Sequence, residues 1–431
     1  MSSASRTFAL NVGSLVWNFA VAVLLSRTLG TEGYGAYSYA LALSLLLVVP
    51  AGLGLPMLVV RQVAAYQVRQ QPSLVRGIIR RSLQATVCAS AAVVVVAAVV
   101  AVTLVGSDDT VRRPLLVGLL FVPAAALYRL AEGVLRGFGQ VVHGRIGETT
   151  VQPVLLIAAV VTLVALGTEV DAGAAMALTV VAGTVAAIVS WRFVSRKTPD
   201  VVRLAEPRHD LRSWSHSARP LLILNGAQTV QLQIGLVLLG LFGEVAESGI
   251  FHVALRLAGF VAFLQFAVIF PLAPAISQLH ARGDREGLQR LLSGVVLVGT
   301  AFGVATAAGL LLFSEEVLGV FGPGFADGST ALLVLVVGEL VNVVSGPAAV
   351  TLTMTNRERI VAASVSTSVV VNVGLAALLI PRFGLEGVAA ARAATVAVTN
   401  GYLVWQLWRH EQLYAPALGR RLVRLVTRSG R

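Results

Sequence analysis

Long apolar stretches dominate the chain. Each runs for about twenty residues or more with few charges, which is the length an α-helix needs to cross the hydrocarbon core of a bilayer. Val-rich runs such as 93–96 could be buried strands, because β-branched residues favour sheets, but stretches of this length exceed any usual strand. The predicted spans are 8–26, 34–56, 82–106, 114–136, 147–167, 172–194, 216–243, 248–276, 288–313, 327–354, 360–381 and 386–408. The pattern therefore predicts an all-α integral membrane protein with twelve transmembrane helices.

Two other interpretations of the apolar stretches fit less well. Outer-membrane barrels alternate apolar and polar residues with a period of two, whereas the apolar residues here are continuous. The first stretch follows Arg6 and could be a signal peptide. No convincing small-residue cleavage site follows it, and Arg27 and Glu32 end it as a span ends. We expect it to be an uncleaved first helix.

Composition agrees with a membrane protein. Charged residues make up 13% of the 431 residues and apolar residues 56%, whereas soluble domains carry roughly 25% charged residues. The net charge of +12 would suggest nucleic acid in a more polar chain. In an apolar chain it suggests basic loops beside anionic lipids at a cytoplasmic face. A single cysteine, Cys88, excludes a disulfide framework and a cysteine-based metal or iron–sulfur site.

The distribution of Lys and Arg among the loops predicts the orientation. With the N-terminus inside, 25 of the 33 cations fall in cytoplasmic segments, four in outer loops, and four within or at the ends of spans. Cytoplasmic loops of membrane proteins carry such an excess. Adding or removing one span would reverse every later loop and remove the asymmetry. We therefore expect a multi-pass protein of the cell inner (cytoplasmic) membrane with both termini in the cytoplasm.

The longest polar segment divides the predicted spans six and six. It contains two prolines and charges of both signs, and it is too short to form a domain. The expected organisation is an N-lobe at 1–194 with helices one to six, a cytoplasmic connector at 195–215, a C-lobe at 216–408 with helices seven to twelve, and a basic cytoplasmic tail at 409–431.

The two halves also resemble each other. Gly35 and Gly249 stand in equivalent loops 214 positions apart, and Gly173 and Gly387 are separated by the same 214 positions. Six spans in each half make the repeats parallel, related by an axis along the membrane normal. Two six-helix lobes around a central cavity form the architecture of a transporter.

One loop carries a recognisable motif. Residues 27–37 read Arg-Thr-Leu-Gly-Thr-Glu-Gly-Tyr-Gly-Ala-Tyr after a first span that bears Asn11. This segment resembles the R-x-L-G-x-x-G-Y-G-x-Y signature of Wzx-type polysaccharide flippases, the lipid-linked oligosaccharide flippases of the MOP (MATE-like) superfamily. Looser resemblances run along the rest of the chain, at 52–56 with Arg61, at Pro271 and Pro274 before Ser277, and at Asn372 with 379–387.

The resemblance implies a function that the spans and charges alone do not reach. It implies alternating access and movement of an undecaprenyl-pyrophosphate-linked oligosaccharide from the inner to the outer leaflet, for surface polysaccharide export. The implied partners are the lipid-linked glycan substrate and anionic membrane lipids, with a polysaccharide polymerase and chain-length machinery as further candidates. Nucleic acid is not expected.

Several charges fall inside the predicted spans, where each costs about 2.5–3.5 kcal/mol on insertion scales and usually faces a cavity. Arg129 and Glu132 are three residues apart and can pair on one helix face. Glu148 lies near the start of the fifth span, where water could solvate it. Glu339, with Asn342 one turn later, could be a proton or ion site or a hydrogen-bonded tie between helices. Glu132 is a second candidate for ion or proton coupling.

Three arginines are candidates for the pyrophosphate, because guanidinium binds phosphate oxygens in bidentate fashion. Arg256, one turn after His252, is the main one, since the resemblance implies a cavity-lining arginine at this place in the related lipid-linked peptidoglycan precursor flippases. Arg61 is a candidate because it belongs to the looser resemblance at the end of the second span, at 52–56. Arg27 is a candidate because it ends the first span on the outer side. Each has a structural alternative: helix pairing for Arg256, an ordinary cytoplasmic cation for Arg61, and an ion pair with Glu32 for Arg27.

The seventh span carries amides at i, i+3 and i+6, namely Asn225, Gln228 and Gln231. We expect them to share a face and to offer donors and acceptors either to sugar hydroxyls or to neighbouring helices.

The sequence contains no recognisable catalytic machinery. Its six histidines lack metal-ligand spacing, and it has no Walker A motif, Gly-rich nucleotide loop or G-x-S-x-G elbow. We therefore expect no enzymatic activity, cofactor or metal.

Two other functions are alternatives to the flippase. A MATE-like drug or cation antiporter would have a cavity dominated by acids and aromatic residues. A membrane polysaccharide polymerase or ligase expects a large outer loop, whereas the longest outer segment, about 314–326, is short.

The predicted topology can be tested by thiol labelling. A cysteine introduced at Ser107 should react with an impermeant reagent added from outside, and one at Ser195 should not, because the cation distribution places them on opposite sides. Cys88, inside the third span, should stay largely unlabelled and serves as the control. Labelling of Ser195→Cys but not of Ser107→Cys from outside would reverse the orientation.

Overall fold

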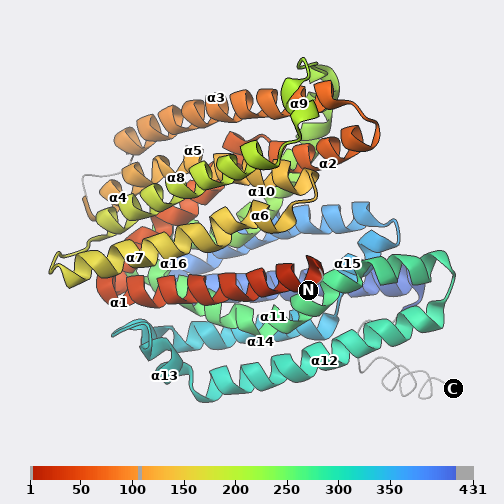
Figure 1. Ribbon diagram of the computed structural model, residues 1–431. Coiled ribbons are helices and arrows are strands. Elements are labelled where there is room, and N and C mark those ends of the chain that lie inside the picture. Colours follow the sequence, from red (N-terminus) through yellow and green to blue (C-terminus); the bar gives the residue numbers. More distant parts are fainter. Residues whose placement is uncertain (1–2, 105–108, 414–431) are drawn as a thin grey trace, which may run out of the picture. The chain divides into compact units, whose positions relative to one another are not determined.

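The computed structural model describes residues 3–104 and 109–413 of the chain, and the regular elements within these ranges are all helices (Figure 1). Ser107 and most of the predicted tail at 409–431 lie outside the described residues, and so do the side chains of Pro271 and Pro274. Within the described residues, ten helical segments, each a single helix or a run of consecutive helical elements, are long and apolar enough to cross a membrane. The prediction of an all-α integral membrane protein is confirmed.

Two of these ten segments each contain two spans. The first helix, α1 (Ser3–Gly52), has 50 residues and the last, α16 (Glu358–Glu411), has 54. At 1.5 Å per residue each is about 75–80 Å long, more than twice the roughly 30 Å of hydrocarbon. Each is interrupted at a glycine with positive φ, Gly30 (φ 68°) and Gly384 (φ 48°). The ten segments are therefore long enough for the twelve predicted spans, and α1 and α16 are interrupted between the two spans that each contains.

The chain packs into two compact units, residues 1–240 and 241–431. The first unit comprises α1, α2 (Leu55–Val68), α3 (Pro72–Leu104), α4 (Asp109–Leu119), α5 (Phe121–Gly137), α6 (Val141–Ile146), the π-helical turn η1 (Gly147–Val151), α7 (Gln152–Ala165), α8 (Ala172–Lys197), α9 (Asp200–Leu204) and α10 (Leu211–Phe242). The second comprises α11 (Val245–Ala281), α12 (Arg285–Leu312), α13 (Ser314–Gly319), the 3-10 turn η2 (Phe325–Gly328), α14 (Ser329–Ser345), α15 (Ala348–Met354) and α16.

By packing, α10 belongs with the first unit, although the expected lobes divide before it. Trp214 and Ala218 of α10 lie in a buried apolar cluster with residues of α2, α3, α5 and α8. The Trp214 indole N–H donates to the Tyr66 hydroxyl over 2.9 Å. A hydrogen bond also joins the segment before α10 to α3, because the Arg76 guanidinium donates to the Ala205 carbonyl over 2.7 Å. The lobe boundaries at 1–194 and 216–408 remain a prediction.

Helix α5 is the central helix of the first unit and packs against α1, α2, α3 and α8. Two glycines allow the close approach of its neighbour α2. A Cβ at Gly133 would lie 2.5 Å from the Pro56 carbonyl oxygen, and one at Gly137 would lie 2.8 Å from the Val63 Cβ. At these two positions α2 and α5 therefore pack too closely to admit a side chain on α5.

The interruption of α16 gives a stability prediction. At Gly384 the backbone is in a conformation that side chains avoid, and an added Cβ would lie 2.6 Å from Glu247 Oε1. Gly384→Ala should therefore lower the free energy of unfolding by about 1–3 kcal/mol, seen as a lower melting temperature in detergent. Gly374→Ala is the matched control within the same helix, since a Cβ there meets no described atom within 4 Å. Equal melting temperatures for the two variants would contradict the role of Gly384.

Candidate functional site

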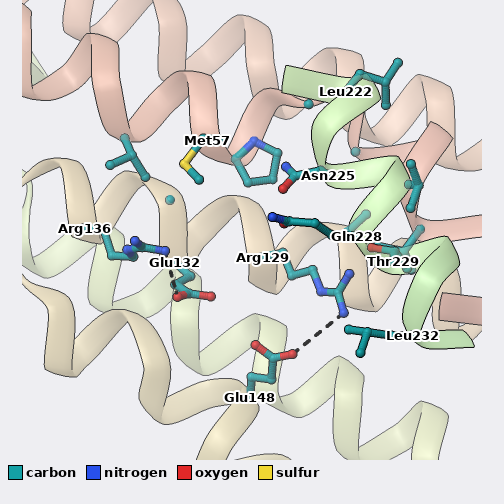
Figure 2. Close-up of a pocket in the computed structure, with 18 residues that line it drawn as sticks. Met57, Arg129, Glu132, Arg136, Glu148, Leu222, Asn225, Gln228, Thr229 and Leu232 are labelled. Carbon is teal, nitrogen blue, oxygen red and sulfur yellow. Dashed lines mark ion pairs between the residues drawn. The ribbon is translucent and has the colours of Figure 1, made fainter. Parts of the chain in front are cut away.

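A polar cavity of about 350 Å³ lies within the first unit, bounded by α1, α2, α5, η1 and α10 (Figure 2). Its apolar lining comes mainly from the ends of α1 and α2 and from α10, and its charges come from α5 and η1. The lining residues are Val48, Val49, Gly52, Gly54, Pro56, Met57, Val60, Ala126, Arg129, Glu132, Gly133, Arg136, Glu148, Leu222, Asn225, Gln228, Thr229 and Leu232.

The turn between α1 and α2 shapes one wall of this cavity. Leu53 (φ 51°) and Gly54 (φ 70°) both have positive φ and interrupt the helix between α1 and α2, which begins at Leu55. A Cβ at Gly54 would lie 2.6 Å from the Leu222 amide nitrogen and 2.7 Å from the Ala218 carbonyl oxygen. Glycine is thus required here for both conformation and space, and it lets the backbone of α10 pass beside the turn.

The four charged residues of the cavity form two ion pairs, drawn in Figure 2. Arg129 Nη2 lies 3.9 Å from Glu148 Oε1, which joins α5 to η1. Arg136 Nη1 lies 3.5 Å from Glu132 Oε1 within α5. The pairing of Arg129 with Glu132 expected from their spacing is not among the described ion pairs, because each residue has another partner. Glu148 lines the cavity, and its side chain is 37% exposed.

The π-helical turn is what brings Glu148 to this place. In η1 the chain makes a wider turn than an α-helix, and such turns occur often at functional sites. Gly147 packs so closely on Ser190 of α8 that a Cβ would clash with the Ser190 hydroxyl. The backbone of η1 is therefore held against α8, and the next side chain, Glu148, points toward Arg129 (Figure 2).

Two of the three predicted amides line the cavity. Asn225 and Gln228 of α10 do so, together with Thr229. Gln231 does not, because three residues advance only 300° around a helix and two such steps turn the side chain about 120° away from Asn225. The expected shared face therefore holds for the first two amides and not for the third.

The lining is electrically balanced. Its two arginines and two glutamates cancel in formal charge, and its amides and the Thr229 hydroxyl offer both donors and acceptors. Such a site favours a ligand with many uncharged hydroxyl or amide groups over a strongly anionic one. Arg136 and Thr229 also line the cavity, although neither was predicted as a site residue. A charge at the end of a predicted span is the signal that could have indicated Arg136.

The other predicted site residues lie elsewhere. Arg61 is an exposed residue of α2, next to the lining residue Val60, and Arg27 is an exposed residue of α1 before Gly30. His252 and Arg256 are half-buried on α11 in the second unit, and neither is among the residues that line the cavity. Their assignment to a pyrophosphate site stays a prediction.

Glu339 takes part in a tie between two helices of the second unit. Its Oε1 lies 3.7 Å from Arg392 Nη2 on α16, and its Oε2 accepts a hydrogen bond from Asn342 over 3.1 Å. Two charges inside one bundle thus neutralise each other. Among residues 3–104 and 109–413, no group of three or more His, Cys, Asp and Glu is placed to hold a metal ion.

Comparison with solved structures defines the class of the protein by its fold. An inward-facing MATE family multidrug resistance transporter of the MOP superfamily matches with a TM-score of 0.76 at 15% identity, covering 92% of this chain and 94% of that one. The lipid II flippase MurJ in an inward closed conformation matches with a TM-score of 0.72 at 11% identity, covering 93% of this chain and 87% of that one. The protein is a multi-pass helical membrane protein with the MOP superfamily fold.

Sequence comparison then gives the family. The family model for "Polysaccharide biosynthesis protein" matches residues 4–280, and the chain belongs to this family. Two Haloferax volcanii proteins are related at 26% identity: the probable low-salt glycan biosynthesis flippase Agl15 over 164 residues, 38% of this chain, and the probable flippase AglR over 175 residues, 39% of this chain. The matches span 35% and 36% of the lengths of these relatives. The family resemblance is confirmed.

The ion pair between α5 and η1 should be energetically coupled. The side chains of Arg129 and Glu148 are 30% and 37% exposed, whereas those of the pair Arg113–Asp171 are 62% and 56% exposed. A double-mutant cycle with Arg129→Gln and Glu148→Gln should give a coupling of roughly 0.5–3 kcal/mol in thermal or denaturant unfolding. The same cycle on Arg113 and Asp171 should give about 0–1 kcal/mol. A coupling no larger than in this control would mean that water already screens the cavity pair.

Proposed function

We propose that the protein is an alternating-access flippase that moves an undecaprenyl-pyrophosphate-linked oligosaccharide from the inner to the outer leaflet of the cytoplasmic membrane, for surface polysaccharide export. Membership of the polysaccharide biosynthesis family supports this, as do relatives named as flippases. The observation that carries the proposal is the balanced polar cavity of the first unit. A protein that transfers sugars through a bilayer needs such a polar surface, because unpaired polar groups in hydrocarbon are costly.

The cavity suits the glycan part of this substrate. Sugar hydroxyls both donate and accept hydrogen bonds, and so do the side chains of Asn225, Gln228 and Thr229. The volume of about 350 Å³ falls within the usual range for small-molecule sites. Arg129 adds strong hydrogen-bond donors and Glu148 adds strong acceptors. Because their formal charges cancel, the cavity stays neutral and a bound sugar can be released.

The pyrophosphate needs cations, and Arg256 is the proposed main ligand, with Arg61, Arg27 and His252 as further contributors. A guanidinium fork binds two phosphate oxygens at once, which a neutral side chain cannot match. Glu132 and Glu339 are proposed for ion or proton coupling, since each carboxylate is paired with an arginine that a conformational change could release. Both termini are proposed to be cytoplasmic, and a polysaccharide polymerase and chain-length machinery are proposed as partners.

A MATE-like drug or cation antiporter is the second candidate. The similarity to MATE transporters in fold favours it. The neutral balance of the cavity favours the flippase, because a site for cationic drugs would carry an excess of acids. Transport of a cationic dye by proteoliposomes, with no movement of lipid-linked sugar, would decide for the antiporter.

Arg256 gives the first functional prediction. In proteoliposomes with labelled undecaprenyl-pyrophosphate sugar, Arg256→Ala should reduce flipping strongly while the protein still reaches the membrane. Arg256→Lys should recover only part, because a point charge lacks the bidentate fork. Arg203→Ala is the control, since Arg203 lies on α9 in an exposed pair with Asp200. Normal transport by Arg256→Ala at wild-type expression would make Arg256 a structural residue.

The amides of α10 give the second functional prediction. Asn225→Ala and Gln228→Ala should each raise the apparent KM for the labelled substrate about 2- to 10-fold, as expected when one hydrogen bond of roughly 0.5–1.5 kcal/mol is lost. Gln231→Ala is a matched control on the same helix, outside the cavity lining, and should change the KM by less than about twofold. If all three variants behave alike, the cavity of the first unit does not bind the glycan.

A further inference from the structure

A second, largely apolar cavity of about 560 Å³ forms a slot between α5 and α8 of the first unit. On one side it is lined by Leu120, Pro123, Ala124 and Leu127. On the other it is lined by α8 residues from Thr184 to Ser195. On both sides the lining residues follow steps of three and four, so each helix presents one continuous face to the slot.

Small residues form the floor of the slot and large ones its walls. Ala124 and Ala187 are each only 6% exposed, whereas Leu120 and Ile188 are exposed above them. The helices are held close by Gly183, where a Cβ would lie 2.7 Å from the Phe121 ring. The alanines beside this contact form the floor of the slot. The slot is therefore narrow, apolar and open along one side.

The length of the slot matches one leaflet of a membrane. Thr184 and Ser195 are eleven residues apart on α8, which is about 16 Å along the helix axis. Half of the roughly 30 Å hydrocarbon core is about 15 Å. A single extended hydrocarbon chain, running from one membrane surface to the midplane, would therefore fill it from end to end.

Among the described residues that line the slot, the one charged side chain lies at one end. Arg192 and Trp191 line this end, and Arg196 and Lys197 follow in the last turn of α8. The Trp191 indole N–H donates to the Leu127 carbonyl over 3.1 Å, which fixes the ring across the slot. At the opposite end the Thr184 hydroxyl donates to its own helix, at the Val180 carbonyl over 2.8 Å. The slot is thus apolar along its length and cationic at its mouth.

The slot does not share a face with the polar cavity. Leu127 lines the slot and Arg129 lines the cavity, and two residues correspond to about 200° around a helix. The two sites therefore lie on opposite faces of α5. A lipid in the slot is separated from the proposed glycan site by the helix itself.

We propose that this slot binds one acyl chain of an anionic phospholipid, with the headgroup phosphate at Arg192. The bound chain fills the gap between α5 and α8 and so stabilises the helix that carries Arg129 and Glu132. The chemistry of the ligand follows from the apolar length and the cationic mouth. The proposal does not depend on the transported substrate, so it stands or falls separately from the flippase function.

The test measures binding of phosphatidylglycerol and phosphatidylcholine with the same acyl chains to the purified full-length protein in a neutral detergent. Native mass spectrometry gives the bound fraction, and thermal unfolding gives the stabilisation. The wild type should bind phosphatidylglycerol more tightly, with a saturable rise in melting temperature. Arg192→Gln should weaken phosphatidylglycerol binding about fivefold and weaken phosphatidylcholine binding much less, because the choline cation already neutralises the phosphate of that lipid.

Three further variants separate the slot from general charge and packing effects. Arg196→Gln removes a cation from the same helix end outside the slot lining and should keep the preference for phosphatidylglycerol. Ala187→Leu fills the floor and should abolish binding of both lipids. Ile188→Ala lowers an exposed wall and should weaken both, which tests the slot even if Ala187→Leu does not fold. An unchanged preference in Arg192→Gln, an equal loss in Arg196→Gln, or full binding by Ile188→Ala would overturn the proposal.

Discussion

The free-energy cost of placing a charged side chain in hydrocarbon is the constraint that decides which helix faces meet in this structure. An arginine or glutamate at the centre of a span is tolerated only when it is paired or faces a polar space. In the first unit Arg129 is paired with Glu148, and in the second Arg392 is paired with Glu339. Each pair joins two separate elements, α5 with η1 and α14 with α16. The pairs therefore satisfy the charges and also fix which helix faces meet.

Backbone geometry supplies the second constraint, because the charges meet only if the helices bend in the right places. Gly54 allows α10 to pass beside the start of α2, and the π-helical turn turns Glu148 toward α5. The result is a cavity that is polar and neutral inside an apolar unit. A neutral cavity can host sugar hydroxyls without holding them too tightly to release, which is what the proposed flippase function requires.

Part of this could be predicted from the sequence. The spans and the turns at Gly30 and Gly384 follow from hydrophobic length and glycine placement, and the structure has them where the pattern indicated. The faces of Asn225 and Gln228 also follow from helical spacing. The partner of Arg129 could not be predicted, because the π-helical turn that brings Glu148 to it leaves no signal in the hydrophobic pattern. Packing of α10 with the first unit could not be predicted either, since it depends on contacts such as Trp214 with Tyr66 across the fold.

The central claim is that this protein moves a lipid-linked glycan across the bilayer. The most direct measurement follows labelled undecaprenyl-pyrophosphate sugar in proteoliposomes, beside protein-free vesicles and vesicles that hold an unrelated helical membrane protein of similar size. The account predicts that the wild-type protein alone moves the glycan lipid between leaflets, and that unlabelled glycan lipid competes while polyprenyl phosphate without sugar competes poorly. Glycan-lipid movement no faster than in the two controls, from protein that is folded and correctly inserted, would contradict it.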